Sequence, residues 1–185
     1  STPTGISAGS ITTTSAILSW AAAAGAVSYS VQYRQSGAAT WNTTTTATNS
    51  VSLTALNPAT AYEYEVKTIC SSDSSSYTSS LYFTTLALPC TIPSGLATVP
   101  TTTSTAVVNW TTVAGAAGYN VAYRQTGLLT WNYITVSTNS ITLTGLNPAS
   151  NYQYKVQTIC ATDSSVYSLA SGFTTLAPAC TMPSG

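Results

Sequence analysis

The sequence repeats itself with a fixed offset of 90 residues, and this feature limits the possible folds more than any other. Trp20 returns as Trp110 and Cys70 returns as Cys160, and no insertion or deletion separates the two copies. A unit that recurs at a fixed period is one structural element of an array, so each copy is expected to fold as a small domain of its own.

The junction between the copies repeats as well. Residues 90–95 read Cys-Thr-Ile-Pro-Ser-Gly, and residues 180–185 read Cys-Thr-Met-Pro-Ser-Gly. We therefore predict domains at residues 1–89 and 90–179, with residues 180–185 beginning a following repeat or a linker. On this interpretation the chain is part of a longer array of such repeats.

Each copy has the pattern of β strands rather than of helices. Tyr29, Val31 and Tyr33 alternate with the polar Gln32 and Arg34, and this period of two indicates a strand with one face on a core and the other in water. Seven such strands in one copy fit an immunoglobulin-like sandwich, and the chain is predicted to be all-β. In the first copy we expect the strands near residues 5–9, 15–20, 27–35, 40–46, 50–56, 61–70 and 78–85.

Several motifs, found in order in both copies, resemble those of fibronectin type III domains. Residues 56–62, which read Leu-Asn-Pro-Ala-Thr-Ala-Tyr, resemble the corner between the fifth and sixth strands, and residues 146–152 repeat it. Residues 29–34 are similar to the family's third strand. The resemblance implies two tandem seven-stranded fibronectin type III sandwiches. In each, a Tyr hydroxyl would bond to the preceding turn, and the implied core and tyrosine-corner residues are Trp20, Tyr62, Trp110 and Tyr152.

The resemblance also implies a disulfide pairing, which suits an oxidising compartment. In this fold the N-terminus lies at the same pole as the loop after the sixth strand, so Cys90 is expected to bond Cys160. A Cys70–Cys90 bond would have to bridge a whole strand of about 26 Å, whereas bonded Cα atoms lie within about 7 Å. Cys70 and Cys180 are then left for a neighbouring repeat or another chain. Zinc binding is disfavoured because the sequence has no His and no CxxC.

Two further tryptophans, Trp41 and Trp131, allow two interpretations. They lie early in an expected edge strand, and they are expected either to pack in the core or between the sheets, or to be exposed platforms on which a sugar stacks. Trp is usually largely buried, which favours packing.

The sequence offers little for catalysis. It contains no His, so the usual general base is absent. Glu63 and Glu65 share one face of a strand, and paired carboxylates are used by retaining glycosidases, but the second copy has Gln and Lys at these positions. The plainer interpretation is a solvated ladder with Arg34 and Lys67. We therefore predict no catalytic residue, no metal site and no cofactor.

Charge limits the partners. Only 4% of the residues are charged, with four basic and four acidic side chains, so neither a phosphate-binding stripe nor attraction to an anionic membrane is expected. No apolar run is long enough for a membrane helix. Glycans could hydrate such a surface, and the candidate positions are Ser74 and Ser164, which otherwise form simple turns after Asp, and Asn42, which begins an Asn-Thr-Thr sequence.

Two functions are consistent with these features. Such repeats resemble those of large secreted or surface proteins of bacteria, which implies a non-enzymatic, extracellular module of an adhesin or a filament. Its partners would be neighbouring repeats or identical subunits in a head-to-tail array, with glycans as further partners. The alternative is a spacer or carbohydrate-binding accessory domain of a secreted polysaccharide-degrading enzyme.

Overall fold

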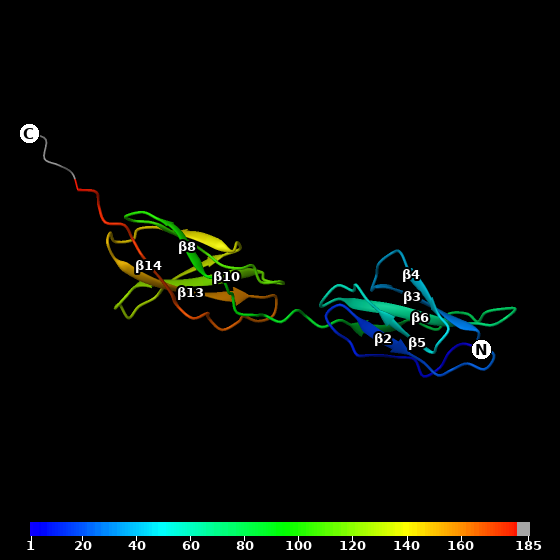
Figure 1. Ribbon diagram of the computed structural model, residues 1–185. Coiled ribbons are helices and arrows are strands. Elements are labelled where there is room, and N and C mark those ends of the chain that lie inside the picture. The colour runs from blue at the N-terminus through cyan, green and yellow to red at the C-terminus, as the bar shows by residue number, and fades with distance from the viewer. Residues whose placement is uncertain (181–185) are drawn as a thin grey trace, which may run out of the picture. The chain divides into compact units, whose positions relative to one another are not determined.

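The computed structural model describes residues 1–180, which divide into two compact units, shown in Figure 1. The first domain is Ser1–Leu88 and the second is Pro89–Gly185. Residues 181–185, part of the segment predicted to begin a following repeat or a linker, lie outside the described residues. The described part of the chain consists of strands, turns and loops, which confirms the all-β prediction. It contains no helix that is long and apolar enough to cross a membrane.

The first domain is a sandwich of two antiparallel sheets. One sheet has three strands in the order β1-β2-β5, and the other has four strands in the order β4-β3-β6-β7. The seven strands are β1 (Ser7–Gly9), β2 (Ala16–Ser19), β3 (Ser28–Gln35), β4 (Asn42–Thr46), β5 (Ser50–Leu53), β6 (Ala61–Ile69) and β7 (Leu81–Thr84).

The second domain repeats this topology, with sheets ordered β12-β9-β8 and β11-β10-β13-β14. Its strands are β8 (Ala97–Thr101), β9 (Ala106–Asn109), β10 (Gly118–Gln125), β11 (Asn132–Val136), β12 (Ser140–Leu143), β13 (Asn151–Ile159) and β14 (Ser171–Thr174). A register shift between Thr98 and Thr101 makes the β8–β9 pairing irregular.

Alternation along β3 and β6 creates the core. Tyr29 and Val31 of β3 and Val66 of β6 are buried between the sheets, while Arg34 and Glu63 face the other side of the same sheet. Most strands of the first domain lie within the ranges expected from the sequence but are shorter than expected. The seventh strand begins at Leu81 rather than near residue 78, because the chain before it keeps only separate hydrogen bonds to β6 instead of a regular ladder.

A buried Trp anchors each core. Trp20 and Trp110 are 3% and 2% exposed, and each meets a Tyr edge-on, Tyr29 or Tyr119, with ring centroids 5.2 Å apart. Burying a ring of this size contributes about 4–6 kcal/mol. That gain exceeds the roughly 1–3 kcal/mol cost of the indole N–H groups, which are buried without a hydrogen-bond partner in the described residues.

A second anchor is the Tyr corner. The backbone N–H of Asn57 donates to the Tyr62 hydroxyl at 2.9 Å, and the N–H of Asn147 donates to Tyr152 at the same distance. The Tyr62 ring also stacks on Phe83 with centroids 5.5 Å apart. The hydroxyl thus ties the turn before β6 to a ring that is itself fixed in the core.

Replacing this hydroxyl should weaken the first domain. In Tyr62→Phe the ring still fills the core, but the Asn57 N–H loses its acceptor, so the free energy of unfolding should fall by about 0.5–1.5 kcal/mol. Urea unfolding of the whole chain measures this loss. Tyr82→Phe is the matched control, because Tyr82 is 66% exposed. An equal loss in both variants would contradict a specific role for the corner.

Candidate functional site

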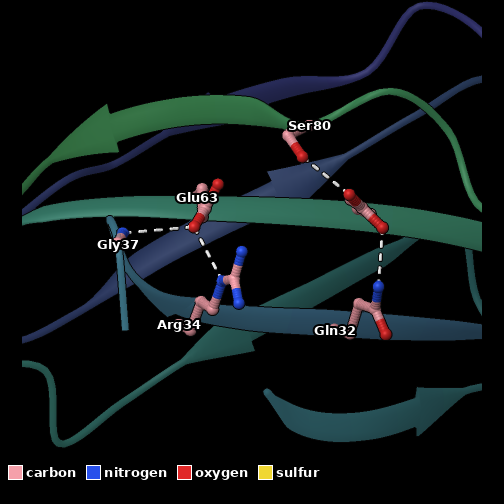
Figure 2. A network of polar contacts seen from close by, with 6 residues as sticks. Gln32, Arg34, Gly37, Glu63 and Ser80 are labelled. Atoms are coloured by element: carbon pink, nitrogen blue, oxygen red, sulfur yellow. Dashed lines mark hydrogen bonds and ion pairs between the residues drawn. The ribbon is translucent and has the colours of Figure 1, made fainter. Parts of the chain in front are cut away.

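The outer face of the four-stranded sheet carries most of the charged side chains of the first domain. There the Arg34 guanidinium donates through Nε to Glu63 Oε1 at 2.7 Å, and the Gly37 N–H donates to the same oxygen at 3.3 Å (Figure 2). Both partners lie largely out of solvent, with side chains 24% and 9% exposed. The predicted ladder is therefore present at Arg34, but it is not solvated as expected, because the chain around the pair shields both side chains.

The second carboxylate, Glu65, is held differently. Gln32 Nε2 donates to Glu65 Oε2 at 2.6 Å, and Ser80 Oγ donates to Oε1 at 2.6 Å, as Figure 2 shows. The expected partnership with Lys67 is therefore wrong. The Lys67 ammonium instead lies 4.9 Å from the centre of the Tyr77 ring, because Tyr77 covers this end of the sheet.

The arrangement of these acids is structural. Each carboxylate accepts two hydrogen bonds from groups of the same domain, which connect β6 to β3 and to the segment before β7. Charge-assisted bonds of this kind are shorter and stronger than neutral ones, so they stiffen the sheet.

Trp41 and Trp131 lie just outside the edge strands β4 and β11, and both are half-buried. The Arg34 guanidinium lies 4.1 Å from the Trp41 ring centre, and Arg124 lies 4.2 Å from that of Trp131. The interpretation of these rings as core or inter-sheet residues is wrong, because the Arg partners belong to the outer face of the sheet. Their alternative role in ligand contact stays a prediction.

The disulfide lies in the second domain. Cys90 precedes β8, Cys160 follows β13, and their Cα atoms are 5.9 Å apart, so the predicted bond is present. A second tie lies beside it, because Thr158 Oγ1 donates to the carbonyl of Thr91 at 2.7 Å. Together they fix the first residues of the repeat to the end of its longest strand.

This bridge shortens the free chain before the second domain. In the first domain, the Leu86 N–H still donates to the carbonyl of Thr12 at 2.9 Å. Only residues 87–89, which read Ala-Leu-Pro, separate that bond from the bridged Cys90.

Two cysteines are free thiols in the described structure: Cys70, which is half-buried after β6, and Cys180, which is exposed. Cys70 occupies the position that corresponds to the bonded Cys160.

The Asp163 carboxylate lies within 4.8 Å of both sulfurs of the disulfide. Zinc is bound by thiolates, whereas these two sulfurs are bonded to each other, so this cluster does not form a zinc site in the oxidised protein.

The glycosylation candidates are accessible. Ser74, Ser164 and Asn42 are all exposed, the first two in the loops after β6 and β13 and the third at the start of β4. Their modification stays a prediction.

Sequence reasoning missed the roles of Tyr77 and Tyr167, which cover Lys67 and Lys155. Their recurrence at the 90-residue offset was the signal available.

Comparison with known proteins identifies the architecture. The model of the fibronectin type III domain matches residues 1–84 and again residues 91–171. The chain belongs to the fibronectin type III family. This fibronectin type III pair also resembles a two-domain fibronectin type III segment of chicken tenascin, with a TM-score of 0.57 and 19% identity over 95% of this chain and 100% of that one.

A longer protein contains a related stretch. The fibronectin type III pair is 32% identical over 163 residues to Endoglucanase B of Cellulomonas fimi. The match covers 81% of this chain but only 16% of the length of that endoglucanase.

Removing the disulfide should destabilise only the second fibronectin type III domain. Cys90→Ser with Cys160→Ser opens a loop whose ends are 70 residues apart, and the chain-entropy model gives a loss of about 4 kcal/mol. Thermal unfolding by calorimetry should show the second domain melting earlier. Cys70→Ser is the matched control and should leave both transitions in place, whereas an unchanged profile in the double variant would contradict a stabilising bridge.

Proposed function

We propose that this fibronectin type III pair is a non-catalytic spacer in an extracellular protein that degrades polysaccharide. The observation that carries the proposal is the Cys90–Cys160 bridge, which leaves three residues of free chain between the domains. A spacer must keep its two ends apart, and a short tether limits how far neighbouring domains can rearrange.

The tether is short and stiff. Three residues span at most about 11 Å when fully extended. Pro89 restricts the backbone further, because its ring fixes one dihedral angle and limits the residue before it. After the second domain the Leu176 N–H donates to the carbonyl of Thr102 at 2.9 Å, and residues 177–179, which read Ala-Pro-Ala, separate that bond from Cys180.

The extracellular setting is supported by chemistry and by likeness. Structural disulfides persist in oxidising compartments outside the cytosol. The match to Endoglucanase B covers 81% of the chain and therefore reaches into both domains, so the tandem arrangement has a relative inside a larger protein named for cleavage of a glucan. The paired acids Glu63 and Glu65 fit this non-catalytic role, since each is engaged by donors of its own sheet.

The spacer should respond to loss of the bridge. In Cys90→Ser with Cys160→Ser, the free chain between the domains lengthens and the range of inter-domain distances should widen. Small-angle X-ray scattering of the whole chain measures this as a broader distance distribution at temperatures where both domains stay folded. Cys70→Ser controls for loss of a thiol. Identical profiles for the bridged and unbridged proteins would contradict the spacer mechanism.

A second candidate function is a repeat of a surface adhesin or filament, and the two free thiols favour it. Cys180 stands where Cys90 stands one repeat earlier, and Cys70 stands where Cys160 stands one repeat later. Cys180 of one molecule could therefore bond Cys70 of the next in the same way as Cys90 bonds Cys160.

Head-to-tail bonding has a simple test. In a mildly oxidising thiol buffer the chain should form a ladder of multimers on a non-reducing gel. Cys70→Ser and Cys180→Ser should each stop the ladder, and a mixture of the two variants should give dimers only. Efficient dimers of Cys70→Ser alone would indicate unspecific Cys180–Cys180 bonding and would contradict the filament role.

A further inference from the structure

We propose that the outer face of the four-stranded sheet of the second domain binds an acidic polysaccharide, with uronate carboxylates at Lys155 and Arg124 and a sugar ring against Tyr133. This site goes beyond spacing. The choice of a polysaccharide as the partner rests on the proposed extracellular function, whereas the charge of the partner follows from the contacts below.

Lys155 is a cation without an acidic partner. Its ammonium lies 4.6 Å from the centre of the Trp131 ring and 4.7 Å from that of Tyr167, so two aromatic rings hold it. Among residues 1–180 the single ion pair is Arg34–Glu63, in the other domain. The one carboxylate of the second repeat belongs to Asp163, beside the disulfide. The positive charge of Lys155 is therefore positioned but not neutralised.

Arg124 is held in the same manner by neutral groups. Its Nη1 donates to the carbonyl of Leu129 at 3.2 Å, and its guanidinium lies against Trp131. With the Gln153 amide oxygen turned toward it, that oxygen accepts from Nε and Nη2 at 2.7 and 2.8 Å. A planar guanidinium fixed in this way suits recognition of carboxylates. Two ordered cations thus share one sheet face.

The first domain shows the same face neutralised. Glu63 and Glu65 stand where the second domain has Gln153 and Lys155. The first repeat has two cations and three carboxylates, a net charge of −1, whereas the second has two cations and one carboxylate, a net charge of +1. The change of sign is concentrated on the outer face of the sheet, where an anionic ligand would lie.

An exposed ring completes the site. Tyr133 is 64% exposed and lies opposite Ala122, which in turn lies opposite Lys155 on the next strand. Two inter-strand steps place Tyr133 and Lys155 about 10 Å apart along the sheet. The small Ala122 side chain lies between them and is fully buried, whereas the first domain has the half-buried Gln32 at this position and Thr43 in place of the ring.

Tyr167 also borders this surface, because its ring centre lies 4.7 Å from the Lys155 ammonium. Burial raises the pKa of its hydroxyl, and the neighbouring Tyr133 adds to the effect, which agrees with the two rings bordering the same patch. An aromatic ring offers an apolar surface beside a polar group, and the ring of a uronate offers the matching combination of C–H groups and carboxylate. The two cations Lys155 and Arg124 are too few to bind a duplex nucleic acid, whose backbone carries a dense row of phosphate charges.

The test uses the whole chain and a galacturonate oligosaccharide, with binding followed by isothermal titration calorimetry. We expect one site per chain and no heat with the fully methyl-esterified form of the same oligosaccharide, which lacks the charge. Lys155→Glu, which copies the first repeat, should weaken binding roughly tenfold or more, since charge-assisted bonds are lost. Tyr133→Thr, which also copies the first repeat, should weaken it several-fold.

Matched variants make the result decisive. Lys67→Glu changes the net charge equally but lies in the first domain, and it should bind as the unchanged chain does. Gln32→Ala, Thr43→Tyr, Glu63→Gln and Glu65→Lys together copy the face of the second domain onto the first and should add a second site. Thermal unfolding checks that each variant is folded.

Several outcomes would overturn the proposal. These are no binding to the unchanged chain, equal binding of the esterified oligosaccharide, equal weakening by Lys67→Glu, or preference for a nucleic acid over the uronate. Each of these leaves the scattering test of the spacer unaffected, so failure of the site is distinguishable from failure of the proposed function.

Discussion

The packing of two sheets around one Trp in each domain is the interaction on which the rest of the structure depends. With 4% of residues charged, electrostatic attraction contributes little to the fold, and stability comes from apolar burial and backbone ladders. Trp20, which directly follows β2 of the smaller sheet, meets Tyr29 of β3 edge-on, and β3 and β6 bury their apolar faces in the same core. The outer face of the larger sheet is a consequence, since every second residue of those strands must point outward.

The two copies show which positions this constraint reaches. Val31 and Val121 are both fully buried on the core side of the sheet. The residues that follow them, Gln32 and Ala122, belong to the outer face of the sheet and differ in size and polarity. The pair Glu65 and Lys155 differs even in sign of charge. A face that carries no core residue can change its chemistry without changing the fold, which is why one framework can present a neutralised surface in one domain and a cationic aromatic surface in the next.

Much of the fold follows from the sequence, and the exceptions have physical causes. The alternation around Val31 predicts the strands, and the family topology predicts the Cys90–Cys160 bond, because topology decides which ends meet. The position of Trp41 was not predictable, since a Trp just before an edge strand has the same pattern whether it turns inward or covers an Arg. The partner of Lys67 was missed because Tyr77 lies in a loop without periodic pattern.

The place of the disulfide matters for the array as well as for the second domain. A bond from Cys70 to Cys90 would instead cross-link the first domain to the residue at which the second repeat begins, and the second domain would have no bridge to its own first residue. The observed bond joins the first residue of a repeat to the strand end of that same repeat, so the tether is shortened from the side of the following domain. The core folds each sandwich, and the bond adds about 4 kcal/mol of stability to the second domain while it also shortens the free chain before that domain. The redox state of the surroundings therefore acts on the stability of the second domain as well as on the length of the tether.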